Sequence, residues 1–340
     1  MVVLMKSSLA LAVLLIVALQ GLVAGAHHGH HEHRVLIAVV PAHWAAVINM
    51  AGHPFVRAFS PLPPHIPHHD YEPSPEDIRR ALQADIIVVE NPDHVAAADD
   101  LIKAAQEAGK RYISVEDEVV RMGWRHLFKP SGVDNPHISH DVSATLMMLG
   151  IVRDEVARVA REKGIPEAEV REFLVRYNGA MSALKAVYYA SVEYGIQRAK
   201  GMKGVALFSA GDSQYMMKWI LVDPVTIVVE ESEAELRPGD LAKLKEAGVR
   251  CVVMLDEEKV SERVLSELRN LGIKPVVVRS LQAQQVGAPF LNYALMGELI
   301  ASECAEEPAP APEVGGLTIA LGAYAAAVTL ALAFLLLRRR

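Results

Sequence analysis

The chain has 340 residues, and its 34 lysines and arginines against 41 aspartates and glutamates give a formal net charge of −7. This acidic balance excludes a basic nucleic-acid-binding protein, which would need clustered positive charge. All 14 histidines lie between His27 and His140. Because imidazole is the commonest metal ligand in proteins, this skew points to metal chemistry in the N-terminal half, with chance drift in surface loops as the alternative.

The two ends of the chain have the composition of targeting segments. Residues 1–26 contain Lys6, an apolar run and a small-residue cleavage pattern, as in a secretory signal peptide. Residues 317–337 are uncharged and apolar, and as a helix they would extend about 31 Å, enough to cross a bilayer core of ~30 Å. The arginines at 338–340 would then stay in the cytoplasm. We therefore expect an extracytoplasmic protein, anchored to the cell membrane by a C-terminal transmembrane helix with a short cytoplasmic arginine tail.

A histidine-rich tract at residues 27–33 would open the mature protein. Such a tract can capture metal loosely at the surface, but it also binds metal in solution without a defined role. The histidines concerned are His27, His28, His30, His31 and His33.

Residues 34–163 alternate between buried strand patterns and helical patterns, which predicts an N-terminal α/β lobe of parallel βα units. The expected strands are 34–40, 56–60, 85–90 and 111–115, and the expected helices are 45–51, 74–83, 94–108 and 142–163.

A proline-rich loop at residues 61–70 ends in two adjacent imidazoles, His68 and His69. The helix after this loop has Ser74 as its N-cap residue and Asp77 three residues later. Because a capped helix holds the preceding loop rigidly, this loop is a good place to fix a ligand.

A helical pattern from Pro166 to about Lys200 would extend about 50 Å, long enough to join two lobes, and residues 164–202 are assigned to this linking helix. Residues 203–304 repeat the alternation and predict a C-terminal α/β lobe, followed by a semi-rigid stalk rich in proline and glutamate at 305–316. Since ligands bind at the carboxyl ends of parallel strands, we expect the site in the crevice between the lobes. The expected strands are 204–208, 225–229, 250–255 and 274–278, and the expected helices are 213–221, 238–247, 259–271 and 289–303.

The two cysteines lie in different contexts. Cys251 falls in an apolar strand pattern and Cys304 lies near the stalk. We therefore expect no disulfide, although the compartment would permit one.

Three motifs carry a family resemblance. Residues 68–78 read HHDYEPSPEDI, 84–88 read ADIIV and 134–141 read DNPHISHD. These motifs resemble those of the extracytoplasmic substrate-binding proteins of zinc and manganese ABC transporters, the cluster A-I family, and the resemblance extends over roughly residues 34–303. It implies two α/β lobes joined by one long helix, with a metal ion bound between the lobes.

The resemblance implies particular metal ligands. The family signature His-Asp-Tyr-Glu-Pro-x-Pro places its metal-binding histidine at His69, and His68 stands where some zinc binders have an acidic residue. The Pro-His-x-x-x-Asp motif places the second ligand at His137. The second lobe departs from the pattern, because the third ligand corresponds to Ala210 and the fourth falls near Arg279.

Three outcomes remain open for such a degenerate second half site. In the first, His68, His69 and His137 hold Zn²⁺, with Asp212, His43 or water completing a tetrahedron. In the second, only His69 and His137 bind, together with waters. In the third, the fold recognises another ligand, such as an anion attracted by the arginine after the last strand.

The expected function is therefore transport rather than catalysis. An all-imidazole site favours Zn²⁺ over Mn²⁺. The resemblance implies a carrier, expected to be a monomer, that delivers the ion to an ABC permease. The alternatives are a metal-buffering accessory protein and a family member that has lost metal binding. An enzyme is not expected, because the sequence contains no His-Glu-x-x-His motif and no nucleophile elbow.

Overall fold

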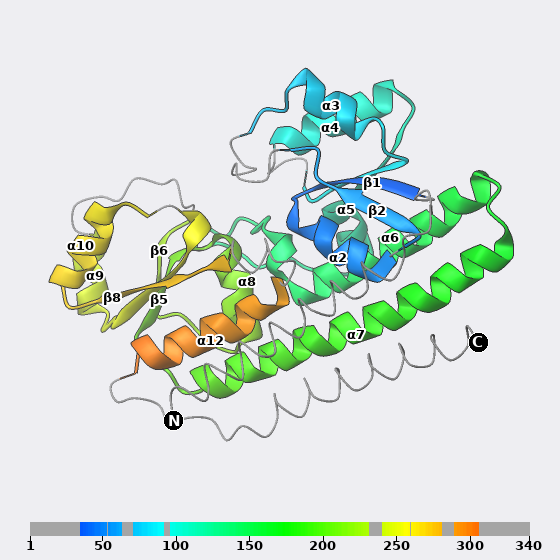
Figure 1. Ribbon diagram of the computed structural model, residues 1–340. Helices are drawn as coiled ribbons and strands as arrows, with labels where there is room; N and C mark the ends of the chain where they lie inside the picture. The colour runs from blue at the N-terminus through cyan, green and yellow to red at the C-terminus, as the bar shows by residue number, and fades with distance from the viewer. Residues whose placement is uncertain are drawn as a thin grey trace.

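Two four-stranded parallel sheets, one in each lobe, form the framework of the molecule (Figure 1). The computed structural model describes residues 35–52, 54–62, 71–91, 96–230, 240–258, 260–280 and 289–305. Within these residues the expected two-lobed α/β fold is confirmed.

The first sheet has the strand order β2-β1-β3-β4 and is covered on both faces. Ile37 and Trp44 belong to one buried cluster, while Ala38 and Leu101 belong to the cluster on the other face. Successive side chains of a strand point to opposite faces, so these strands read as continuous apolar runs. The elements are β1 Val35–Val40, α2 His43–Gly52, β2 Val56–Phe59, α3 Pro75–Ala81, β3 Ile86–Val89, α4 Ala96–Glu107, β4 Arg111–Ser114, α5 Val115–Arg121, η1 Ile138–His140 and α6 Val142–Glu162.

The second sheet repeats this order as β6-β5-β7-β8. In both sheets the strand order reverses beside the first strand, so the carboxyl ends of β1 and β3, and of β5 and β7, flank the crevice where ligands bind in such folds. The elements are β5 Val205–Ser209, α8 Gly211–Trp219, β6 Ile227–Val229, α9 Asp240–Glu246, β7 Cys251–Leu255, η2 Asp256–Glu258, α10 Glu262–Asn270, β8 Lys274–Val278, η3 Pro289–Leu291 and α12 Asn292–Glu303.

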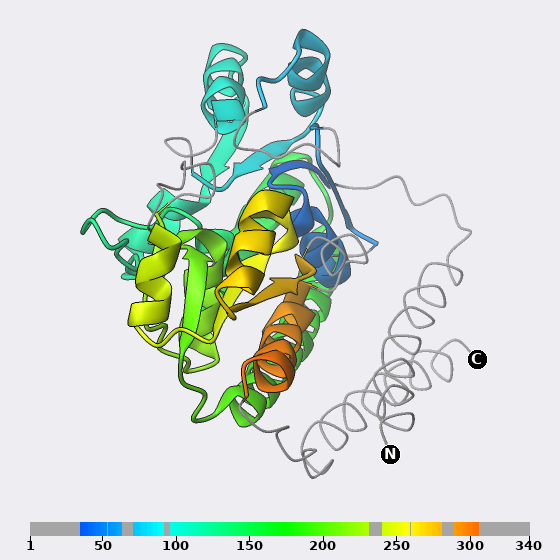
Figure 2. The ribbon, with the colours of Figure 1, turned by 90° about the vertical axis from the view of Figure 1, so that its left-hand side faces the viewer.

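One helix, α7 (Glu167–Ala199), runs along both lobes (Figures 1 and 2). Its 33 residues extend about 50 Å. Phe173 and Tyr177, in its first half, are buried in the core of the first lobe, whereas Val187 and Val192 are buried in the core of the second. The helix therefore connects the two cores, as its length predicts.

Helix α12 packs against the C-terminal half of α7, side by side in both ribbon views (Figures 1 and 2). The contact depends on two glycines, since a Cβ added at Gly297 would lie 2.4 Å from the Cα of Gly195. Beside them, Arg198 Nε lies 2.6 Å from Glu298 Oε2. The second lobe is thus fixed to the linking helix by close backbone contact and an ion pair.

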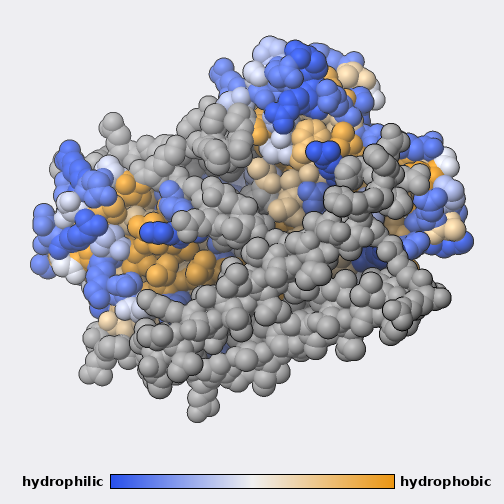
Figure 3. Space-filling model, in the orientation of Figure 1, coloured by the Kyte–Doolittle hydropathy of each residue, from blue (hydrophilic) through white to orange (hydrophobic). Residues whose placement is uncertain are grey.

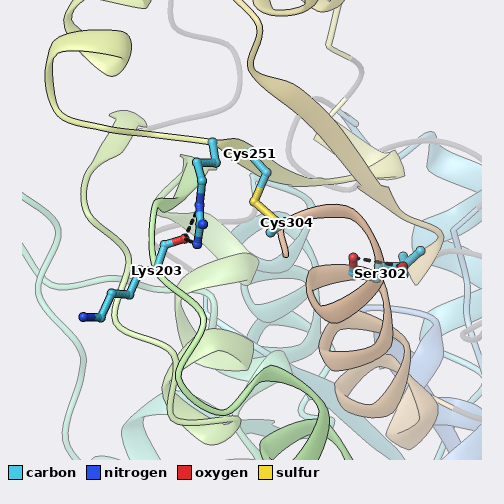
Figure 4. Close-up of a disulfide and its surroundings, with 6 residues drawn as sticks. Lys203, Cys251, Ser302 and Cys304 are labelled. Atoms are coloured by element: carbon cyan, nitrogen blue, oxygen red, sulfur yellow. Dashed lines mark hydrogen bonds between the residues drawn. A yellow bond between two sulfur atoms is a disulfide. The ribbon is translucent and has the colours of Figure 1, made fainter. Parts of the chain in front are cut away.

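The expectation of no disulfide is wrong. Cys251, at the start of β7, is bonded to Cys304, which follows α12, with a Cα–Cα distance of 5.4 Å (Figure 4). The packing of α12 against the second sheet brings together cysteines that are 53 positions apart in the sequence. The bond covalently links the end of α12 to strand β7 of the second sheet.

Helix α5 was not expected from the sequence, because it follows β4 without an intervening turn.

Hydrophilic side chains cover the outer end of the first lobe, over α3 and α4, and the outer side of the second lobe, over α9 and α10 (Figure 3). No helix among the described residues is both long and apolar enough to cross a membrane. The expected signal peptide, stalk and segment 317–337 lie outside those residues.

Candidate metal site

His137 lies at the inner side of the first lobe, just before η1, and its side chain is almost completely buried. Its Nδ1 is 2.9 Å from Asn135 Oδ1, and its backbone N–H donates to the same oxygen at 3.2 Å. An amide oxygen only accepts, so Nδ1 carries the proton and Nε2 carries the lone pair. This is the tautomer in which a histidine binds a metal ion through Nε2, with its other nitrogen held by a partner.

The side-chain nitrogen of Asn135 reaches across to the second lobe. It donates to the carbonyl oxygens of Ala210 and Gly211 at 3.2 and 3.0 Å and to Gln214 Oε1 at 2.8 Å. Three acceptors around this atom fix the orientation of the amide, which in turn fixes the imidazole of His137. The segment that carries the histidine is thereby attached to the start of α8.

Tyr215 strengthens this attachment. Its hydroxyl donates to the carbonyl oxygen of Asn135 at 2.8 Å and accepts from the backbone N–H of Leu127 at 3.2 Å. Burial raises the pKa of Tyr215 far above its ordinary value, so the phenol stays protonated. A second connection is made by Asp141, whose carboxylate accepts from the indole nitrogens of Trp124 at 3.1 Å and Trp219 at 2.8 Å.

Gly211 lies against the imidazole of His137. A Cβ at this position would lie 3.5 Å from both Cε1 and Nε2 of His137 and 3.3 Å from Ser209 Oγ. Nε2 therefore faces the carboxyl end of β5, in the second lobe. In the neutral imidazole this nitrogen carries the lone pair, which is the donor that would bind a metal ion as cargo.

The structure describes both positions of the second lobe at which the resemblance implies a ligand, Ala210 and Arg279. Ala210 is fully buried and its side chain offers no donor atom. Arg279 directly follows β8 and is exposed. The side chain at neither position can ligate a cation.

One buried carboxyl group lies beside the His137 segment. Glu90, at the carboxyl end of β3, is 1% exposed, and its Oε1 accepts from the backbone N–H of Ser139 at 2.7 Å. This hydrogen bond fixes the segment that follows His137 to the end of the first sheet.

His126 is a partly buried imidazole of this region. Its Nε2 lies 2.8 Å from Glu116 Oε1 and its Nδ1 lies 3.0 Å from the carbonyl oxygen of Asn135. Both neighbours are acceptors, so both nitrogens donate when the ring is protonated. The hydrogen bond to Glu116 raises the pKa of His126 above its ordinary value, and this outweighs the opposite effect of burial.

The structure describes only part of the expected ligand set. His68, His69 and the tract at 27–33 lie outside the described residues. His43 is the first residue of α2 and Asp212 the second residue of α8, but their side chains are not described. Among the side chains that are described, no three histidine, cysteine, aspartate or glutamate residues form a group that could hold a metal ion.

The helix after the proline-rich loop begins as expected. The Ser74 side chain accepts from the backbone N–H of Asp77, and the Asp77 side chain accepts from the backbone N–H of Ser74 at 2.9 Å. This capping box fixes the position at which the chain enters α3.

Sequence reasoning gave no role to three polar residues of this region: Asn135, Ser209 and Glu258. Asn135 falls inside the DNPHISHD motif, two residues before His137, and Ser209 and Glu258 lie at or just beyond strand ends. A polar residue at the carboxyl end of a parallel strand is the signal that could have found the last two.

These features define a two-lobed solute-binding protein with a candidate metal site between its lobes. The sequence model of the family described as "Zinc-uptake complex component A periplasmic" (ZnuA) matches residues 42–298. The chain therefore belongs to the ZnuA family. No curated protein matches its sequence.

Solved structures share the fold. FpvC from Pseudomonas aeruginosa in complex with Mn²⁺ has 17% identity and a TM-score of 0.62, over 78% of this chain and 98% of that chain. A zinc-bound deletion mutant of ZnuA has 17% identity and a TM-score of 0.62, over 81% and 99%. The Zn(II)-bound ZnuA-like domain of Streptococcus pneumoniae AdcA has 15% identity and a TM-score of 0.59, over 79% and 98%. At these identities the likeness concerns the fold.

Proposed function

We propose that this protein captures a divalent metal ion between its lobes, zinc in preference to manganese, and delivers it to an ABC permease. The observation that carries the proposal is the orientation of His137, whose Nδ1 is held by Asn135 while Nε2 faces Gly211 at the start of α8. Membership of the ZnuA family supports the same role. The solved structures that share the fold include complexes with Zn(II), Mn²⁺ and Ni²⁺.

The ligand set of the proposal is His69 and His137, with His68 as a third imidazole. An imidazole-rich site favours Zn²⁺, whereas Mn²⁺ prefers carboxylates and water. His43 and Asp212 remain secondary candidates, since both belong to helices that start beside the crevice. The protein binds and releases the ion as a monomeric carrier and breaks no bond. Residues 317–337 would hold it at the outer surface of the cell membrane.

Calorimetric titration of the full-length chain, freed of metal by a chelator, tests the binding proposal. We expect one tight Zn²⁺ site that binds Mn²⁺ more weakly. The His137→Ala variant should lose at least about 100-fold in zinc affinity, more than the 10–100-fold typical of losing an outer-shell partner.

The matched control replaces the five histidines of the 27–33 tract by glutamine. The control should keep the tight site and lose only weak additional binding. Zinc affinity that disappears in the control and survives in His137→Ala would contradict the proposal. Delivery is a separate question: a permease gene beside this one favours transport, and its absence favours a buffering protein.

A further inference from the structure

A buried glutamate lies at the inner side of the second lobe, where the strand order of the sheet reverses. Glu258 ends η2, directly after β7, and is 9% exposed. Its Oε2 accepts from the backbone N–H of Leu255 at 2.9 Å. Its Oε1 accepts from the hydroxyl of Ser209, the last residue of β5, and from the hydroxyl of Ser213 at 3.4 Å. The carboxylate is thus held in place by three donors at the carboxyl ends of β5 and β7.

The contact with Glu258 decides what Ser209 can do on its other side. A hydroxyl has one proton and two acceptor lone pairs, and an ionised carboxylate only accepts. Because the proton of Ser209 is donated to Glu258, the Ser209 oxygen can only accept from any further partner. The negative charge of the carboxylate strengthens this acceptor.

Ser209 and His137 both lie against Gly211. A Cβ at Gly211 would contact both Ser209 Oγ, at 3.3 Å, and His137 Nε2, at 3.5 Å, so the two atoms lie within about 7 Å of each other. A zinc ion about 2.0–2.1 Å from Nε2, carrying a water at about 2.0–2.2 Å that makes a hydrogen bond of about 2.7–2.8 Å to Oγ, can bridge a separation up to that length.

We propose that the second lobe holds the metal ion through a zinc-bound water, which donates to Ser209 Oγ while Ser209 donates to Glu258. This serine–glutamate relay stands in for the protein ligands that the second lobe lacks, where Ala210 offers no donor atom. The inference rests on the proposed function. It gives the ion histidines from one lobe and a water held by the other, together with a negative charge that partly balances the cation.

Three variants of the full-length chain test the relay. Gly211→Ala is the sharpest, because the added methyl group fills the space between Ser209 and His137 at near-ordinary contact distances while alanine suits a helix better than glycine. Its thermal midpoint in chelator should equal or exceed that of the wild type, while its Zn²⁺ affinity should fall about 10–100-fold. Ser209→Ala and Glu258→Gln should weaken Zn²⁺ binding over the same range.

Combining Ser209→Ala with Glu258→Gln should cost little more than either change alone, since both act through the same zinc-bound water. The matched control is Glu262→Gln, which removes the same charge from a side chain of the second lobe that is 85% exposed. The control should bind Zn²⁺ like the wild type.

Wild-type zinc affinity in Gly211→Ala and Glu258→Gln, with binding still abolished in His137→Ala, would overturn the relay and leave the proposed function intact. Unchanged zinc affinity in the His137→Ala variant would overturn both the relay and the proposed function. If Glu258→Gln does not fold, Ser209→Ala decides instead, because it removes the hydroxyl that would hold the water and adds no atom beside His137.

Discussion

The side-chain nitrogen of Asn135 lies 3.0 Å from the carbonyl oxygen of Gly211, and this hydrogen bond joins the two lobes directly beside His137. The same amide presents its oxygen to Nδ1 of His137. One asparagine therefore sets the imidazole tautomer and also attaches the segment that carries His137 to the facing lobe.

Replacing Asn135 by alanine should weaken both folding and binding. The change leaves buried carbonyl groups of the second lobe without this donor, so the free energy of unfolding should fall by about 1–3 kcal/mol. Zinc affinity should fall about 10–100-fold, because His137 loses the partner that orients it. Urea unfolding and zinc calorimetry measure the two effects.

Asn270→Ala, at an exposed position at the end of α10, serves as the control for Asn135→Ala and should change neither stability nor zinc affinity. Unchanged zinc affinity in Asn135→Ala would show that the orientation of His137 does not depend on this amide.

His126 should make stability depend on pH. Its folded-state pKa is raised above the ordinary value of 6.5 by Glu116, with Asp134 also contributing in the same direction. A raised folded-state pKa means that the stabilisation is fully present below about pH 6.5 and is lost as pH rises through the folded-state pKa.

The His126→Phe variant keeps an aromatic ring against Trp124 and removes the hydrogen bonds. It should be less stable than the wild type by about 1.5–3 kcal/mol at pH 6, and the difference should shrink by pH 9. Denaturant unfolding of both proteins in chelator at the two pH values measures this. A difference that stays constant or grows with pH would contradict the assignment.

The fold could be predicted from the sequence because strands covered on both faces read as apolar runs, as in residues 34–40. Helix α5 was not predicted from the sequence because Ser114 ends β4 and the helix starts at the next residue, with no turn residue to mark the change. The buried residues Val115 and Val119 do have helical spacing, and this was the available signal.

The motif that contains His137 could be read from the sequence, but the contacts that hold this histidine could not. His137 lies in a local motif, but the partners of Asn135 are 75 and 76 positions away in the sequence. The disulfide was not predicted for the same reason, because the packing of α12 rather than any local pattern brings its cysteines together. Local patterns predict helices, strands and candidate ligands, whereas contacts between the lobes depend on the tertiary fold.

The glycine contact between α7 and α12 should tolerate no side chain. In Gly297→Ala the new Cβ would overlap the backbone of Gly195, which cannot rotate away, so the free energy of unfolding should fall by about 1–3 kcal/mol. Gly179→Ala is the matched control, because the space around Gly179 in α7 is open. The control should be stabilised by about 0.5–1 kcal/mol through helix propensity. Equal stability of the two variants in thermal or urea unfolding would argue against close backbone packing.

The Cys251–Cys304 bond should contribute strongly to the stability of the second lobe. Cross-linking residues 53 positions apart lowers the entropy of the unfolded chain, which corresponds to about 4 kcal/mol in the chain-entropy model. The double variant Cys251→Ala/Cys304→Ala should therefore unfold at lower denaturant concentration than the oxidised wild type. A reductant should lower the midpoint of the wild type and leave that of the double variant unchanged. A reductant effect of equal size on both proteins would exclude the disulfide as its cause.

The most direct test of a metal site between the lobes is a crystal structure of the protein with zinc supplied. The account predicts one ion between the lobes, with Nε2 of His137 about 2.0–2.1 Å from it, imidazoles of His69 and His68 at similar distances, and a water between the ion and Ser209. Zinc bound only to the histidine-rich tract, with His137 Nε2 away from any ion, would contradict it.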